Sequence, residues 1–133
     1  DPNRLAQSLG NLVSNAIKYT PPGGRVNLAI QHLSRLALQR LAQRRALGLE
    51  NTDAVHGYLV ISVKDTGIGI PRNQQQKLFT KFFRSRVVLK SKIEGTGLGL
   101  YIARAIVQLH RGDIWCESTG EHGSTFRFSL PVA

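Results

Sequence analysis

Two asparagines and a lysine near the start of the chain are suited to hold a metal ion beside phosphates. Asn11, Asn15 and Lys18 lie in a segment whose apolar residues recur at helical spacing. At ~100° per residue, the three side chains fall within an arc of roughly 60° on such a helix. Amide oxygens are neutral ligands for Mg²⁺, and an ammonium group neutralises phosphate charge. A solvated polar helix face would give the same pattern, so this segment alone does not decide.

An aspartate followed by two glycines forms the second candidate group. Asp65 ends an apolar run and opens the sequence Asp-Thr-Gly-Ile-Gly-Ile over residues 65–70. Gly67 and Gly69 allow the backbone to turn and a flat ligand to come close. The Asp65 carboxylate could then accept a hydrogen bond from an exocyclic amine such as that of adenine. A tight turn, with Asp65 bonded to nearby backbone N–H groups, is the simpler alternative.

A second glycine-rich segment, Gly-Thr-Gly-Leu-Gly-Leu over residues 95–100, leads into a predicted helix. Backbone N–H groups at a helix N-terminus form a ready site for an anion. The segment is not the dinucleotide-binding fingerprint, because Leu100 stands where that pattern needs glycine. It also lacks the Lys-Ser/Thr pair of the common phosphate-binding loop. A flexible loop that ends in a helix remains an alternative.

The spacing of apolar residues and turn signals predicts the elements that position these groups. We expect a capped first helix through Ile17, a stop at residues 21–24, and a half-buried strand from Arg25 to Leu33. A strand at residues 58–63, a helix at about 73–83, a second helix that leaves the glycine segment 95–100 and runs to about residue 110, and a closing hairpin of residues 113–117 and 124–130 follow. The predicted fold is a single α/β (α+β) domain over residues 1–133. It is a two-layer sandwich with a mixed, mostly antiparallel sheet covered on one face by helices.

Residues 34–57 form a long connection between two predicted strands, and a structureless loop of that length is unusual in a compact domain. We therefore predict a helix within Ser34 to Leu47, with Leu36, Ala37, Leu41 and Leu47 facing the protein. Its arginines indicate either a solvated insertion or a docking surface for a partner, and both interpretations stay open.

The formal net charge of +10 suits a polyanionic partner, either nucleic acid, a membrane surface or nucleotide phosphates. Phe79, Phe82 and Phe83 lie within a basic stretch and could stack on single-stranded nucleic acid, although core residues of a helix give the same pattern. The single cysteine fits a reducing compartment, and no apolar run is long enough to span a bilayer. Because the chain has no methionine, we expect it to be a fragment of a longer protein.

The order and spacing of these segments resemble the ATP-binding domain of sensor histidine kinases. That family belongs to a superfamily shared with type II topoisomerases, heat-shock chaperone ATPases and mismatch-repair ATPases. Residues 11–20 resemble its asparagine box, 65–70 its first glycine box, 77–84 its phenylalanine box, 95–100 its second glycine box, and 123–126 its closing strand motif. The resemblance covers nearly the whole chain except residues 34–57, and it implies the Bergerat-type fold.

The resemblance also implies roles for individual residues. Asn15 would ligate Mg²⁺, and Asn11 would support the metal or the phosphates. Lys18 would meet the terminal phosphates, and Tyr19 would lie against the nucleotide. Asp65 would bond the adenine amine, with Thr125 nearby. Arg84 would act in catalysis with Asn11 and Lys18, at the start of a mobile lid over residues 84–96. The other implied contacts to ATP are Gly67, Gly69, Ile70, Phe79, Gly95, Thr96, Gly97, Leu98, Gly99 and Leu100.

The resemblance favours a kinase over a hydrolase. Hydrolases of the superfamily carry a glutamate one turn before the metal-binding asparagine, and here Asn11 occupies that position, where an amide cannot act as a general base. None of the four histidines has the flanking residues of a phosphoacceptor. We therefore expect the phosphoacceptor on a separate helical dimerisation domain that serves a response regulator receiver domain. This chain would be a cytoplasmic monomer, and its parent a homodimer. The alternatives are a superfamily ATPase, a protein-serine kinase module, or a basic nucleic-acid-binding domain.

Overall fold

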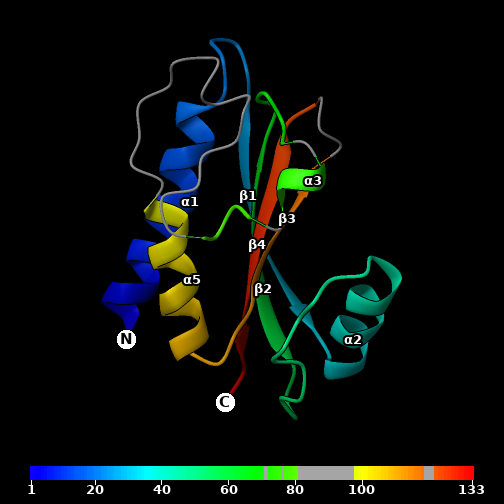
Figure 1. The fold of residues 1–133 in the computed structure, drawn as a ribbon. Coiled ribbons are helices and arrows are strands. Elements are labelled where there is room, and N and C mark those ends of the chain that lie inside the picture. Colours follow the sequence, from blue (N-terminus) through cyan, green and yellow to red (C-terminus); the bar gives the residue numbers. More distant parts are fainter. Residues whose placement is uncertain (71, 76, 81–97, 119–121) are drawn as a thin grey trace.

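The computed structural model describes residues 1–70, 72–75, 77–80, 98–118 and 122–133 (Figure 1). The predictions for Arg84, Gly95, Thr96, Gly97 and the lid of residues 84–96 lie outside these described residues. Within the described part of the chain, no helix has the length and hydropathy needed to cross a membrane.

A four-stranded sheet in the order β1-β2-β4-β3 forms the centre of the molecule, and each neighbouring pair is antiparallel. Its strands are β1 Val26–Leu33, β2 Tyr58–Asp65, β3 Ile114–Ser118 and β4 Ser124–Pro131. The strand β2 pairs with both neighbours in one continuous register, so that Val63 lies between Leu28 of β1 and Phe126 of β4. The predicted α/β class with a mostly antiparallel sheet is confirmed, and each strand lies within about two residues of its predicted bounds.

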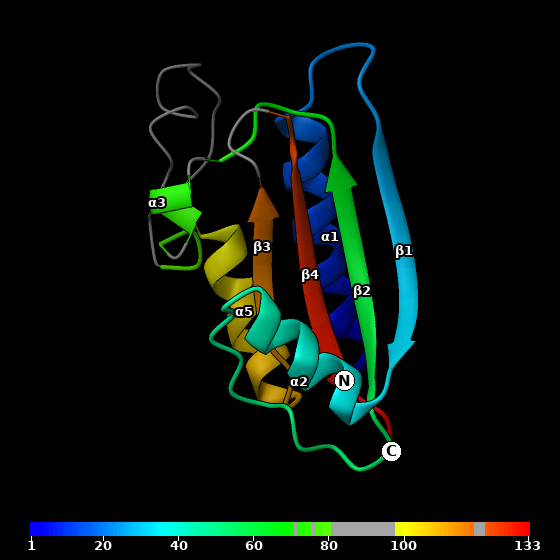
Figure 2. The ribbon, with the colours of Figure 1, turned by 90° about the vertical axis from the view of Figure 1, so that its right-hand side faces the viewer.

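Two long helices, α1 Pro2–Lys18 and α5 Gly99–Leu109, cover one face of the sheet (Figures 1 and 2). The helix α1 begins where predicted, because the Asp1 side chain accepts a hydrogen bond from the backbone N–H of Asn3 and Pro2 occupies the first turn. Its apolar side packs with α5 and the sheet in the main core, which includes Leu12, Val63, Val107, Phe126 and Phe128.

The helix α2, Arg35–Arg44, lies against the opposite face of the sheet, so helices are not confined to one face (Figure 1). The side chain of Leu38 is fully buried there against Tyr58, Val60 and Trp115. The expectation for Leu36 was wrong, because this side chain is 53% exposed. The phase of the helix explains the difference, since Leu36 and Leu38 are about 200° apart around its axis. Leu41 and Leu47 pack against the same small core, as expected.

The helix predicted at residues 73–83 is much shorter in the structure. The helix α3 spans only Arg72–Gln75, and residues 77–79 form a turn. Leu78 and Phe79 nevertheless reach the main core, where the rings of Phe79 and Phe126 meet edge to face with centroids 6.2 Å apart. The apolar spacing that predicted a helix here therefore comes from buried side chains on a turn.

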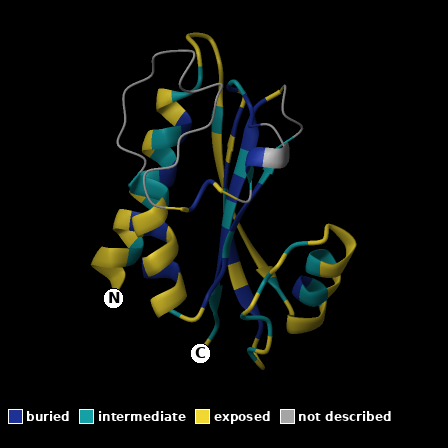
Figure 3. Cartoon of the chain, viewed as in Figure 1, coloured by how far each residue is buried: buried dark blue, intermediate teal, exposed yellow. Residues whose placement is uncertain are grey.

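The strand β1 is more exposed than its alternating sequence predicted. Leu28 and Ile30 are 53% and 72% exposed, although they lie on the same face as the main core (Figure 3). The reason is its position, since β1 is an edge strand and makes fewer contacts with α1 than β2 does.

Candidate functional site

Asp65, at the end of β2, is the most constrained polar residue of the candidate site. Only 4% of the residue is exposed. Its Oδ1 accepts a hydrogen bond from the backbone N–H of Gly67 at 2.8 Å, and its Oδ2 accepts one from the hydroxyl of Ser124 at 2.9 Å. Donors on both oxygens compensate for burying the carboxylate and fix its orientation. Each oxygen keeps further acceptor capacity, because a carboxylate oxygen has two lone pairs.

Two glycines allow the backbone around Asp65 to pack so closely. A Cβ on Gly67 would lie 2.3 Å from the carbonyl oxygen of Tyr19, and one on Gly123 would lie 2.0 Å from the carbonyl oxygen of Asp65. Gly123 also has a φ of +80°, which other residues rarely adopt. The first glycine segment is therefore held between the end of α1 and the start of β4.

The structure brings Ser124, and not Thr125, to Asp65. Side chains alternate between the two faces of a strand, so Thr125 lies on the face opposite to Ser124 and Phe126. Ser124 is a functional candidate that the sequence reasoning missed. The available signal was the alternation itself, because a closing strand that buries Phe126 and Phe128 must direct Ser124 toward the same side.

Asn11 connects α1 to the second glycine segment. Its side-chain Nδ2 donates a hydrogen bond to the carbonyl oxygen of Gly99 at 3.2 Å, at the first residue of α5. This bond uses the N–H side of the amide and leaves its oxygen available as a ligand. The bond thus joins the middle of α1 to the start of α5.

Asn15 and Lys18 continue along α1 from Asn11. Asn15 is partly buried, and its side-chain amide makes no hydrogen bond with any described residue. Lys18 is exposed in the last turn of the helix, and no acidic residue in the described part of the chain pairs with it. Both groups are therefore available to a ligand, an oxygen from Asn15 and a positive charge from Lys18.

Tyr19 ends α1 and joins it to the segment that follows Asp65. Its carbonyl oxygen accepts a hydrogen bond from the backbone N–H of Ile68 at 3.4 Å. Further along this segment, Gly69 has a φ of +70°, and the N–H of Ile70 donates to the hydroxyl of Ser118 at 3.0 Å. These bonds hold the first glycine segment beside the helix that carries Asn11, Asn15 and Lys18.

The remaining predicted contacts differ in how closely they join this group. Ile70 and Phe79 are buried in the main core, and Leu100 packs against it. These three residues therefore belong to the core that supports the site. Leu98 and Gly99 are partly buried at the start of α5.

The donor set fits Mg²⁺ held together with a phosphate chain. Among the described residues no three His, Cys, Asp or Glu side chains gather into a metal-binding group. Mg²⁺ often takes only one or two protein ligands and completes its shell with water and phosphate oxygens. The free amide of Asn15 and the oxygen of Asn11 can supply such ligands.

The comparisons with known proteins agree with this geometry. The family described as histidine kinase-, DNA gyrase B-, and HSP90-like ATPase matches residues 1–133. The sensor histidine kinase WalK of Bacillus subtilis is 39% identical over 131 residues, which make up 98% of this chain and 18% of WalK. The adaptive-response sensory kinase SasA of Synechococcus elongatus is 42% identical over 132 residues, or 99% of this chain and 28% of SasA. The chain therefore spans less than a third of these two relatives.

Solved structures lead to the same family. The mycobacterial sensor histidine kinase MprB superposes with a TM-score of 0.72 at 27% identity, covering 98% of this chain and 72% of that one. Full-length ShkA in complex with AMPPNP gives a TM-score of 0.72 at 26% identity, covering 100% of this chain and 22% of that one. The fold, the arrangement around Asp65 and these similarities agree, and the chain belongs to the histidine kinase-, DNA gyrase B- and HSP90-like ATPase family.

Proposed function

We propose that this chain is the catalytic part of a sensor histidine kinase, which binds Mg-ATP and donates its γ-phosphoryl group to a histidine on a separate helical domain. The observation that carries the proposal is the buried carboxylate of Asp65, held by the N–H of Gly67 and the hydroxyl of Ser124. A fixed acceptor beside glycine-lined backbone suits the amine of adenine, whereas guanine presents a carbonyl at the equivalent position.

The other proposed contacts of the nucleotide lie on α1 and at its C-terminal end. We assign Tyr19 to the nucleoside, Asn15 to Mg²⁺, Asn11 to the metal or the phosphates, and Lys18 to the terminal phosphates. The backbone at Leu98 and Gly99, where α5 begins, suits the phosphate chain. Mg²⁺, when bound, would neutralise phosphate charge and orient the γ-phosphoryl group. Arg84, Gly95, Thr96 and Gly97 keep their proposed roles at the phosphates as sequence predictions.

The partners in the proposal follow from the chemistry of the site and from the relatives. Asn11 cannot activate water as a glutamate would, which supports transfer to another group over hydrolysis. WalK and SasA are named as kinases, and ShkA was solved with the nucleotide AMPPNP. We infer a phosphoacceptor histidine on a dimerisation domain of the parent protein, a response regulator as the next acceptor, and a cytoplasmic location with access to ATP.

The proposal is tested by calorimetry with ATP, with and without Mg²⁺, followed by a transfer assay. We expect saturable binding of ATP that Mg²⁺ strengthens, and very slow release of phosphate by the chain alone. In the protein that joins this chain to its histidine-bearing domain, radiolabel from γ-labelled ATP should appear on a histidine.

Two outcomes would favour the alternatives. Steady release of phosphate without any phosphorylated protein would favour an ATPase. Failure to bind ATP, together with binding of single-stranded nucleic acid that weakens steeply with salt and needs no Mg²⁺, would favour a nucleic-acid module.

A further inference from the structure

The strand β3 is an edge of the described sheet, and part of its hydrogen-bonding capacity is unused. The backbone N–H of Ser129 in β4 donates to the carbonyl oxygen of Asp113, immediately before β3. Because backbone groups alternate in direction along an antiparallel strand, those of Ile114 and Cys116 point away from β4. The next outward carbonyl, that of Ser118, accepts a bond from Gln75 at 2.9 Å, which agrees with this assignment. No described residue bonds the outward groups of Ile114 and Cys116.

A groove of about 1150 Å³ runs along this edge and includes all five residues of β3 among its walls. One wall comes from α5, the end of α3 and the turn after it, with Arg104, Gln75 and Phe79. The other wall comes from the end of α2 and the loop after it, with Arg45 and Leu47. The edge of β1 is the other outer edge of the described sheet. The edge of β3 is therefore framed on both sides, as a binding site for an extended chain requires.

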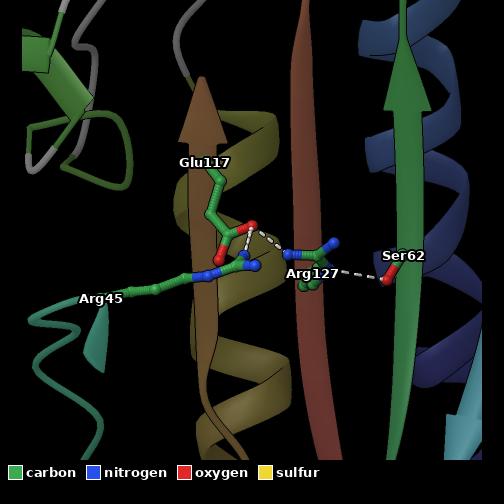
Figure 4. A network of polar contacts seen from close by, with 4 residues as sticks. All are labelled: Arg45, Ser62, Glu117 and Arg127. Atoms are coloured by element: carbon green, nitrogen blue, oxygen red, sulfur yellow. Dashed lines mark hydrogen bonds and ion pairs between the residues drawn. The ribbon is translucent and has the colours of Figure 1, made fainter. Parts of the chain in front are cut away.

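The wall formed by α2 is fixed to the sheet through an ionic network. Arg45 and Arg127 both pair with Oε2 of Glu117 on β3, and Arg127 also donates to the hydroxyl of Ser62 at 3.0 Å (Figure 4). The network joins α2 to three strands of the sheet. This wall therefore has a defined position relative to the edge of β3.

The unpaired charges of the groove are mainly positive. The ionisable groups that line it are Arg44, Arg45, Lys64 and Arg104 with Glu50, Asp65, Asp113 and Glu117, apart from His122. Asp65 and Glu117 are bonded as described above, and Asp113 accepts from the backbone N–H groups of Glu50 and Asn51. Arg44, Lys64 and Arg104 are exposed and have no ion-pair partner among the described residues. Among the acidic residues of the lining, only Glu50 is exposed.

We propose that the edge of β3 accepts an extended, acidic peptide segment of a partner protein as an additional strand. Backbone groups of the peptide pair with Ile114 and Cys116, while its acidic side chains meet Arg44 on one wall and Arg104 on the other. Adding a strand to an exposed sheet edge is an established mode of peptide recognition. This site goes beyond the proposed kinase function, and its groove also reaches Asp65, Phe79 and Ser124 of the proposed nucleotide site.

Trp115 offers a direct measurement of this binding. It is the only tryptophan of the chain, is 5% exposed, and lies in β3 itself. The probe is a peptide of about nine residues that alternates valine and glutamate, long enough to span the five residues of β3 at ~3.3 Å per residue. We expect a saturable change in Trp115 emission that weakens as salt is added.

Matched variants and matched peptides distinguish this mode from general attraction to polyanions. Arg44→Glu and Arg104→Glu should each weaken binding about fivefold, whereas Arg40→Glu, exposed on the same helix as Arg44 but outside the groove, should not. The same peptide with N-methyl groups on alternate residues cannot pair with a strand and should bind at least tenfold more weakly. That comparison leaves the protein unchanged, so it does not depend on a variant folding.

Three results would overturn the proposal. The first is equal binding of a control peptide that alternates valine and lysine. The second is unchanged binding of the N-methylated peptide. The third is complete displacement by a single-stranded oligonucleotide at equal charge concentration. Binding of Mg-ATP, measured on the same samples, reports separately on the kinase proposal and on the folding of each variant.

Discussion

The hydroxyl of Ser124 donates a hydrogen bond to Oδ2 of Asp65 at 2.9 Å. The two residues lie on neighbouring strands and are 59 positions apart in the sequence. The bond is buried and occupies the carboxylate oxygen that the N–H of Gly67 does not reach. Ser124 therefore positions the acceptor that we assign to adenine, without being a proposed contact of the nucleotide itself.

Replacing Ser124 with alanine should lower the free energy of unfolding by about 1–3 kcal/mol, because it leaves one oxygen of a buried carboxylate without a donor. The affinity for ATP should fall as well, since the orientation of Asp65 is no longer fixed from that side. Chemical denaturation and calorimetry measure the two effects. Thr125→Ala, one residue along on the opposite face, is the matched control, and an equal loss in that variant would contradict the role of Ser124.

Replacing Asp65 with asparagine should weaken binding of ATP by roughly tenfold or more, because the charged acceptor for the adenine amine is lost. Binding of a guanine nucleotide, which has no amine at that position, should change much less. Competition between the two nucleotides on wild type and variant gives the ratio directly. An equal loss for both nucleotides would exclude the contact with adenine.

Replacing Asn15 with alanine should weaken binding of Mg-ATP at least about tenfold, the lower end of the loss seen when a metal site loses a supporting group. Affinity for ATP in the presence of EDTA should change little, because the amide acts through the metal. The fold should persist, since the Asn15 side chain bonds no described residue. Ser14→Ala, at an exposed position on the same helix, serves as control. If Asn15→Ala lowers both affinities equally, Asn15 does not ligate the metal.

The sequence predicted the strands and long helices well because their signals are local. Asp1 and Pro2 mark the start of α1, and glycines and prolines separate the strands. The relation of Asn11 to the second glycine segment was also predictable, from the resemblance to a family with a known order of boxes.

What could not be predicted depends on contacts far apart in the sequence. The exposure of Leu28 and Ile30 follows from the edge position of β1, which no local pattern encodes. The burial of Leu38 in place of Leu36 follows from the Ser34 cap, whose hydroxyl accepts from the N–H of Ala37 and sets where the helix begins. Ser124 was missed because its partner, Asp65, lies in another strand.

Replacing Leu38 with alanine should lower the free energy of unfolding by about 2–5 kcal/mol, because a fully buried leucine leaves a cavity between α2 and the sheet. Leu36→Ala, at an exposed position two residues earlier, should change it by no more than about 0.5 kcal/mol. Urea denaturation of both variants measures the difference. Similar values for the two variants would mean that α2 does not pack on Tyr58 and Trp115 in solution.

Raising the pH above about 9 should destabilise the domain through Cys116. Burial, and to a lesser degree the negative charges of Asp65 and Glu117, raise the pKa of this thiol well above its ordinary value of 9.0. The unfolded chain therefore loses the thiol proton at a lower pH than the folded chain does. Unfolding becomes easier as the pH rises, by about 1.4 kcal/mol at one unit above the unfolded pKa.

The variant Cys116→Ala tests this prediction, because it removes the contribution of the thiol. The free energy of unfolding of the variant should fall less than that of wild type between pH 7.5 and 10. Denaturation curves at each pH give the comparison, in which the lysines and tyrosines common to both proteins cancel. Parallel pH profiles for wild type and variant would show that the thiol is accessible to water in the folded protein.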